Sequence, residues 1–500
     1  MRPASSPLIA SAAPLCAPLC ALLCALLPAL AGAQSPFPFQ LPFIPLAPQP
    51  DAVQPDSEGW RAIVAEYGAP VKGPQTQLVD DVVAELSRGA GRVAPRGGYR
   101  GTLLDTPVLN AFAIGDGNVF VTRELLAYMN DEDELIGVLG HEVGHVIGGH
   151  SRFSYATNAA KAGEDQLFGV FLPPLRGVEQ LGTTVVVRGF DRAQEHAADV
   201  AGVKFLADLG RDPTAMGRAL GVLDAASKLQ EKTFGARPTG ALDYWLDDHP
   251  IQSERMAMLN LAVSLSPRGR PAPHRSPEAF VRALDGLAID DGPEQGIVDG
   301  GRFRHPVLKF GLDAPAGFRM LNTSNALLLK APGGSSATLK MTNGGGSAQE
   351  RFKAAWTRSF SNDIPPPPPE AIQVGGIAGA SGFVEKRVDD ATVRISLWLY
   401  PWSDTQSFIY AAVDRKGTDT QAHAAAARSF RRLSDDEARS LQVRRVRIVD
   451  VAAGDTVASL SGRMAYADFR EERFRLINGL FNGQPLSKSG PVKLVVWSAP

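Results

Sequence analysis

The chain has 500 residues, a formal net charge of −2 and a 44% share of hydrophobic residues. This length is sufficient for several hydrophobic cores, and we expect two to four domains. The nearly balanced charge argues against a nucleic acid as partner, because proteins that bind nucleic acids carry a basic surface. The composition therefore indicates a multidomain globular protein.

The N-terminal segment has the pattern of an export signal. Arg2 precedes an apolar run over about residues 7–30, and the sequence AGA at 31–33 matches a cleavage site. We expect residues 1–33 to be a signal peptide that directs the protein to a bacterial periplasm or cell envelope, with no transmembrane span in the mature chain. The alternatives are an uncleaved anchor and lipidation at one of the cysteines of the run, Cys16, Cys20 and Cys24.

A proline-rich stretch and a first domain follow the signal. Residues 34–56 are expected to form an extended tether, and residues 57–265 the first domain. Within it, hydrophobic periodicity predicts helices near 60–67 and 78–86, strands near 99–104 and 119–122, and a hairpin turn at 114–118. Apolar patches in 152–189 are too short to cross a bilayer, so we expect them to cover the functional site or to form a lid over it.

The sequence HEVGH at residues 141–145 contains the HExxH pattern. Histidines four residues apart lie on one face of a helix, so His141 and His145 can bind one zinc ion at about 2.0–2.1 Å. Glu142 is then placed to take a proton from water and to pass it to a leaving amine. The acidic residues 131–134, followed by an apolar stretch, indicate that the motif lies within a helix.

The third zinc ligand decides the kind of site. The metzincin pattern HExxHxxGxxH is incomplete, because Ser151 stands at the position of its third histidine, and we expect His150 to be a surface or capping residue. A glutamate from a second helix is the other common solution. Glu195 and Asp199 share a helix face, so one can bind zinc while the other forms a hydrogen bond with a liganding imidazole.

These motifs resemble those of the HtpX/BepA-type gluzincin metallopeptidases, a family that includes the CAAX prenyl endopeptidases and the mitochondrial protease Oma. The sequences HEVGHVIGGH at 141–150 and RAQEHAAD at 192–199 carry the main resemblance. The sequence NAFA at 110–113 is similar to the family's substrate-pairing strand, and His249-Pro250 with Arg255 is similar to its HP…R element. The resemblance covers roughly residues 55–265.

The resemblance implies a mainly helical zincin domain with a small edge β-sheet and one zinc ion per chain. It implies that the zinc ligands are His141, His145 and Glu195. Glu142 is then the general base and later the general acid, and Asp199 orients a liganding histidine. His249 and Arg255 assist the transition state, although His249 has the alternative role of holding a resting site closed. The expected substrate-binding strand consists of Asn110, Ala111, Phe112 and Ala113.

The motif helix contains more glycine than the family usually has. Gly137, Gly140 and Gly144 each lower its stability by about 0.5–1 kcal/mol relative to alanine. We therefore expect a loosened helix that keeps its ligands.

The second half of the chain changes character. Residues 266–299 are expected to be a linker, and residues 300–434 a small α+β sandwich with short alternating strands and one helix near 421–430. No catalytic constellation is visible there, so we expect a role in binding, positioning or autoinhibition. Residues 445–498 resemble a LysM module, a βααβ fold, and that resemblance implies binding of peptidoglycan.

Taken together, the sequence predicts an α+β multidomain protein and an exported zinc endopeptidase that acts on polypeptides, in particular on misfolded envelope proteins. One alternative is an envelope chaperone or scaffold whose proteolytic activity is latent. The other is a cell-wall hydrolase, suggested by the LysM-like segment.

Overall fold

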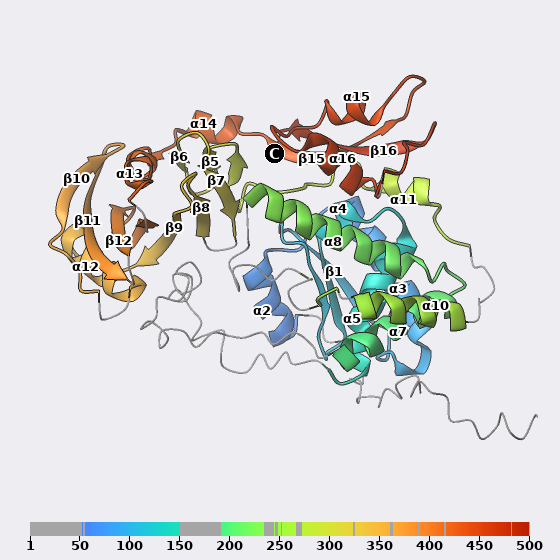
Figure 1. Ribbon diagram of the computed structural model, residues 1–500. Coiled ribbons are helices and arrows are strands. Elements are labelled where there is room, and N and C mark those ends of the chain that lie inside the picture. Colours follow the sequence, from blue (N-terminus) through green and yellow to red (C-terminus); the bar gives the residue numbers. More distant parts are fainter. Residues whose placement is uncertain are drawn as a thin grey trace, which may run out of the picture. The chain divides into compact units, whose positions relative to one another are not determined.

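The computed structural model of the chain is shown in Figure 1. It describes Val53, Trp245 and ten further ranges: 56–150, 192–234, 249–251, 253–266, 273–323, 326–360, 364–388, 391–414, 417–481 and 483–499. The predicted signal peptide, nearly all of the predicted tether and the predicted cover at 152–189 lie outside the described residues. Within the described part, none of the helices has the length and apolar character that crossing a membrane requires.

The first part of the chain is mainly helical, as predicted. A three-stranded sheet lies among its helices, and the strands and hairpin follow the sequence prediction. The elements are α2 (Glu58–Tyr67), α3 (Pro74–Ala90), η1 (Gly91–Val93), β1 (Arg100–Leu104), β2 (Ala111–Ala113), β3 (Asn118–Thr122), α4 (Arg123–Tyr128), α5 (Glu132–Ile147), α7 (Arg192–Asp208), α8 (Ala215–Phe234), α10 (Ser253–Leu265) and α11 (Pro277–Ala283).

The sheet of this part has the order β1-β3-β2. Strand β1 runs parallel to β3, and β2 pairs with β3 as an antiparallel hairpin. Gly117 takes φ 88° in the connecting turn, a conformation that favours glycine. Strand β2 therefore lies at an edge of the sheet, and it contains three of the four residues predicted to pair with substrate.

Two further sheets follow, and they form the predicted α+β sandwich. One has seven strands in the order β10-β11-β12-β13-β9-β8-β7, and the other has four in the order β14-β6-β5-β4. The elements are β4 (Ile297–Asp299), β5 (Arg302–His305), β6 (Phe310–Asp313), β7 (Arg319–Asn322), β8 (Ala326–Lys330), β9 (Ser336–Asn343), α12 (Ala348–Ser359), β10 (Glu370–Val374), β11 (Ile377–Val388), β12 (Ala391–Pro401), β13 (Gln406–Asp414), α13 (Thr420–Arg428), β14 (Arg431–Arg432) and α14 (Asp435–Ser440).

Strand β12 separates the two cores of this sandwich, because successive side chains of a strand point to opposite faces. Tyr400 packs with Phe310 and Phe430 in a core that joins the two sheets. Leu397 packs on the other face with Trp356 of α12, a helix that the sequence analysis missed. Figure 1 shows α12 against this outer face of β11 and β12. The seven-stranded sheet is thus covered on both faces.

The C-terminal segment has the predicted order of elements. Strands β15 (Val443–Asp450) and β16 (Pro491–Ser498) form an antiparallel hairpin that encloses α15 (Val457–Ser461) and α16 (Arg470–Ile477). This agrees with a βααβ arrangement, whereas its identity as a LysM module stays a prediction.

The segment predicted as a linker is in part regular structure. It contains α11 and β4, and residues 286–289 pair with β15 through hydrogen bonds such as Val446 N–H to the Leu287 carbonyl oxygen at 2.8 Å. Lys493 of β16 is fully buried and donates to the carbonyl oxygens of Ala127 and Met129 at 2.9 and 2.8 Å. The hairpin is therefore bound to the residues that precede α5.

Candidate metal centre

The motif helix α5 packs closely on α7 because of its glycines. A Cβ atom on Gly144 would lie 2.8 Å from the Cβ of Ala201 and 3.1 Å from the Cα of Ala198, both on α7. A Cβ atom on Gly140 would likewise lie 3.2 Å from the Cα of Gly202 of α7. These glycines therefore allow the two helices to approach each other, a role that the sequence analysis did not assign to them, and the predicted loosening of the helix stays a prediction.

The acidic residues at the start of α5 form ion pairs with arginine side chains. Asp131 caps the helix by accepting a hydrogen bond from Glu134 N–H at 2.7 Å. Arg211 lies buried among three carboxylates, those of Glu85, Glu132 and Asp133. The sequence analysis used the acidic residues only as a sign of the helix, but in the structure they also form ion pairs that fix the helix start.

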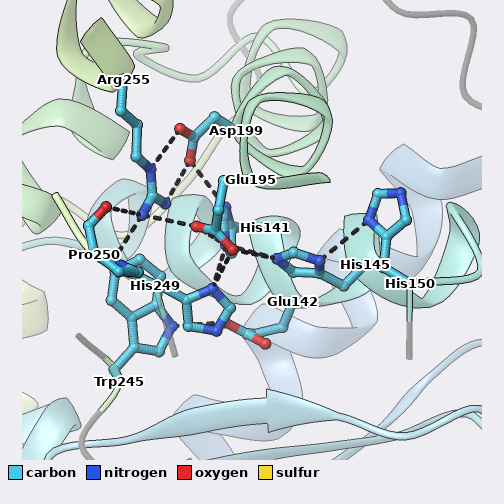
Figure 2. Close-up of polar contacts among 10 residues, drawn as sticks. All are labelled: His141, Glu142, His145, His150, Glu195, Asp199, Trp245, His249, Pro250 and Arg255. Carbon is cyan, nitrogen blue, oxygen red and sulfur yellow. Dashed lines mark hydrogen bonds and ion pairs between the residues drawn. The ribbon is translucent and has the colours of Figure 1, made fainter. Parts of the chain in front are cut away.

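Four buried side chains converge at the C-terminal part of α5 (Figure 2). His141 and His145 come from α5, Glu195 comes from α7, and His249 lies beyond α8. One ligand atom from each of the four lies within 4.8 Å of the others. The Nε2 atoms of His141 and His145 are 3.0 Å apart, and the Nδ1 atom of His249 is 3.2 Å from the Nε2 atom of His141 and 2.8 Å from Oε1 of Glu195.

The donor set fits a zinc ion. Tetrahedral ligands at about 2.0–2.1 Å from zinc lie roughly 3.3 Å apart, and Oε1 of Glu195 lies 3.3 Å from Nε2 of His145. The other oxygen, Oε2, is buried and forms an ion pair with Nη1 of Arg255 at 2.8 Å. Oε1 therefore faces the imidazoles and is the oxygen that can bind the metal.

The electrostatics of the cluster favour neutral rings at His141 and His145 beside an ionised Glu195. Burial lowers the pKa of His141 well below its usual value and lowers the pKa of His145 to about 4. Burial by itself raises the pKa of Glu195, but hydrogen bonds with His145 and His249 outweigh it and hold the pKa low. Burial lowers the pKa of His249 as well, but the charge of Glu142 and the hydrogen bond with Glu195 outweigh it and raise that pKa above its usual value. Neutral histidine and ionised glutamate are the forms that bind zinc.

Asp199 and Arg255 support this cluster from α7 and α10. Oδ1 of Asp199 lies 2.9 Å from Nδ1 of His141, so the carboxylate orients the ring whose Nε2 faces the cluster. Arg255 donates two hydrogen bonds to Asp199, both at 2.8 Å, and one to the carbonyl oxygen of His249 at 2.9 Å. In this structure the guanidinium group is therefore engaged in holding Asp199 and the backbone at His249.

Two contacts at the site were missed from the sequence. The indole N–H of Trp245, which is fully buried, donates to Oε1 of Glu142 at 2.6 Å, and its ring stacks on that of His249 with centroids 4.5 Å apart. His150 was expected to lie away from the metal site, but its Nδ1 is 3.2 Å from Nδ1 of His145. Trp245 stands four residues before His249, and this helical spacing was the available signal.

The predicted substrate strand lies beside α5 and is buried. Asn110 is bound to β3, because its N–H donates to the hydroxyl of Thr122 at 3.2 Å. Ala111, Phe112 and Ala113 form β2. The carbonyl oxygen of Leu109, just before this strand, accepts a hydrogen bond from the N–H of Trp245 at 3.1 Å. The segment with Trp245 thus connects the start of the strand with Glu142.

Comparison with known families places this cluster in a recognised domain. Residues 74–262 match the family model of peptidase family M48. This range includes every residue of the predicted zinc site and the predicted substrate strand.

Three relatives align with parts of the chain. The mitochondrial metalloendopeptidase OMA1 of Arabidopsis thaliana is 28% identical over 158 residues, covering 31% of this chain and 30% of that protein. The beta-barrel assembly-enhancing protease of Escherichia coli is 29% identical over 174 residues, covering 31% and 32%. The metalloprotease LoiP of Escherichia coli is 30% identical over 152 residues, covering 29% and 56%. The chain thus spans about a third to about half of the length of these relatives.

Proposed function

We propose that the protein is an exported zinc endopeptidase that hydrolyses peptide bonds of misfolded envelope proteins, on the basis of the match of residues 74–262 to peptidase family M48. The observation that carries the proposal is the buried group of His141, His145 and Glu195, with Glu142 on the same helix. The export pattern of the first 33 residues supports the location. The names of the relatives include two proteases and a metalloendopeptidase, which supports the activity.

The proposed roles follow from the contacts of each side chain. Zinc bound by His141, His145 and Glu195 supplies a Lewis acid that activates water and polarises the scissile carbonyl group. Glu142 accepts the proton of the attacking water and delivers it to the leaving amine. The indole N–H of Trp245 donates to Oε1 and orients the carboxylate, which has further lone pairs to accept a proton.

Asp199 and Arg255 hold the liganding histidine His141 in position. The hydrogen bond from Asp199 keeps the Nε2 atom of His141 directed at the cluster, and the two hydrogen bonds from Arg255 keep the carboxylate of Asp199 in place. An extended substrate adds along β2, so that its main chain supplies affinity with little selection of side chains. Low selectivity suits the degradation of unfolded proteins.

The test is zinc content together with casein cleavage, on the purified protein. We expect about one zinc per chain and cleavage in the wild type. Glu142→Gln replaces the basic carboxylate with a carboxamide of the same shape, so it should retain zinc and lose cleavage. Glu195→Ala should lose both. The proposed ligand set is refuted if Glu195→Ala keeps its zinc and its activity.

A second candidate is a latent protease that acts mainly as a chaperone or scaffold, and His249 favours it. Its Nδ1 atom lies among the donor atoms of the cluster, so the ring can occupy the coordination position on the metal to which water or substrate has to bind. Under this alternative the wild type binds zinc without cleaving casein, and His249→Ala cleaves it. A wild type that cleaves at full rate, with His249→Ala slower, favours the transition-state role instead.

A further inference from the structure

A large cavity lies beside α8, outside the metal centre. Its volume is about 880 Å³, within the range of pockets that bind ligands. Three parts of the chain line it: the segment from Thr106 to Leu109 with α8, the strands around β7, and the C-terminal hairpin with Arg444. We call it the α8 cavity. Phe234 at the end of α8 packs on Leu321 of β7, so the contact between these elements is apolar.

One wall of the α8 cavity offers apolar side chains that are not fully covered. Leu308 is 37% exposed, and Met320, Leu321 and Met341 are partly buried. Methionine is flexible and polarisable, and it recurs on surfaces that bind varied apolar partners. This wall therefore suits bulky apolar groups of differing shape.

Other residues that line the cavity are polar or charged. Glu124 and Asp291 line it together with Arg444, and the hydroxyl group of Tyr466 donates to Asp290 at 2.7 Å. A lipid chain offers nothing to such groups. An extended polypeptide offers hydrogen-bonding main chain and apolar side chains together, so it matches both kinds of lining residue.

The cavity also continues into the predicted substrate strand. The residues from Thr106 to Leu109 line it, and the next residues in the chain are Asn110 and β2. A substrate that pairs with β2 reaches the cavity after three or four more residues, roughly 10–14 Å of extended chain. The cavity therefore begins next to the start of the predicted substrate strand, at Leu109, whose carbonyl oxygen accepts a hydrogen bond from the N–H of Trp245.

We propose that the α8 cavity is a second substrate-binding site, which holds an extended, unfolded stretch of polypeptide with bulky apolar side chains while a neighbouring stretch lies on β2. The proposal rests on the proposed function, since it assumes that β2 binds substrate. It names the substrate class as unfolded chains that are long enough to occupy both places. Short peptides fill β2 alone.

The test compares a long substrate with a short one in the full-length protein. We would measure kcat/KM for unfolded casein and for a peptide of about six residues that spans one of its cleavage sites. Leu308→Asp and Met320→Asp place a charge on the apolar wall. Each is expected to lower the ratio of the casein value to the peptide value roughly five- to tenfold. Phe383→Asp is the matched control, because Phe383 is 45% exposed and does not line the cavity.

A binding assay separates this inference from the proposed function. In Glu142→Gln protein, the anisotropy of fluorescein-labelled unfolded casein reports binding without cleavage. Adding Leu308→Asp should weaken that binding by the same factor, and adding Phe383→Asp should leave it unchanged. If the wild type cleaves, an unchanged ratio in both cavity variants overturns the proposal. If it does not cleave, unchanged binding after addition of Leu308→Asp overturns it. Binding of oleate that casein does not displace overturns it in favour of a lipid.

Discussion

The close packing of α5 on α7 leads to a specific prediction for Gly144→Ala. In an open helix this change is stabilising by about 0.5–1 kcal/mol, because alanine loses less conformational entropy than glycine. Here the added methyl group would lie 2.8 Å from the Cβ of Ala201, and 3.1 and 3.2 Å from the Cα and carbonyl oxygen of Ala198. Two of these three atoms belong to backbone, so a side-chain rotation does not relieve the contact.

The size of the effect follows from these distances. Carbon atoms in contact lie about 3.5–4.0 Å apart, so α7 has to retreat by roughly 0.7–1.2 Å. Overpacking of this kind costs about 1–3 kcal/mol, which leaves a net loss of up to about 2.5 kcal/mol after the gain of about 0.5–1 kcal/mol from alanine. Glu195 and Asp199 flank Ala198 on α7, and metal ligands tolerate displacements of only about 0.2 Å. A shift of about 1 Å can cost roughly 100-fold in rate.

The assay is thermal unfolding, zinc retention against a chelator and casein cleavage, with Gly221→Ala as control. Gly221 lies in α8, and a Cβ atom added there would meet no atom within 4 Å beyond its own stretch of helix. We expect Gly144→Ala to unfold at a lower temperature, to lose zinc more readily and to cleave more slowly, while Gly221→Ala is neutral or slightly stabilised. If Gly144→Ala is as stable as Gly221→Ala and keeps its zinc and its rate, the packing argument fails.

Three further predictions concern charge and metal. Arg211→Met removes the cation that pairs with Glu85, Glu132 and Asp133, of which Glu132 keeps a second partner in Arg275. The change should cost about 3–5 kcal/mol in chemical denaturation, whereas Arg302→Met, at a 66% exposed side chain, should cost about 0.5 kcal/mol or less. Burial lowers the pKa of His423 from 6.5 to about 4, so the unfolded chain binds the proton more tightly than the folded chain. The free energy of unfolding should therefore fall by about 3 kcal/mol between pH 6.5 and 4. In His423→Phe this free energy should fall less steeply over the same pH range. A chelator should lower the unfolding temperature of the wild type and not that of Glu195→Ala, because zinc stabilises only a fold that binds it.

Much of the site could be predicted because its pattern is local. A helix repeats every 3.6 residues, so HExxH places His141 and His145 side by side, and the spacing of Glu195 and Asp199 places both carboxylates on one face of α7. Trp245 was missed because its contact with Glu142 spans 103 residues, and no local rule connects the two. His150 was misplaced for a similar reason. The turn after α5 brings its ring back to His145, which helical periodicity does not anticipate.

The accessory region was predicted less completely. Alternation of apolar residues identified β8, β9 and β12, but α12 was missed although Ser347 and Glu350 form a capping box at its start. The adjacent run of glycines suggested only a turn. The predicted linker contains residues that pair with β15. The two segments lie far apart in the sequence, so neither segment by itself shows that it pairs with the other.

The sequence by itself determined the helix that carries the metal motif, the types of donor atoms available for zinc, and the alternating strands of the second half. These features depend on neighbours within a few positions of the chain, where backbone geometry alone relates one side chain to the next. Only the tertiary structure decided that His249 lies among the donors, that Trp245 binds Glu142, and that glycines bring α7 against α5. Each of these depends on side chains from distant segments that pack at one place, and such packing is selected by the whole fold.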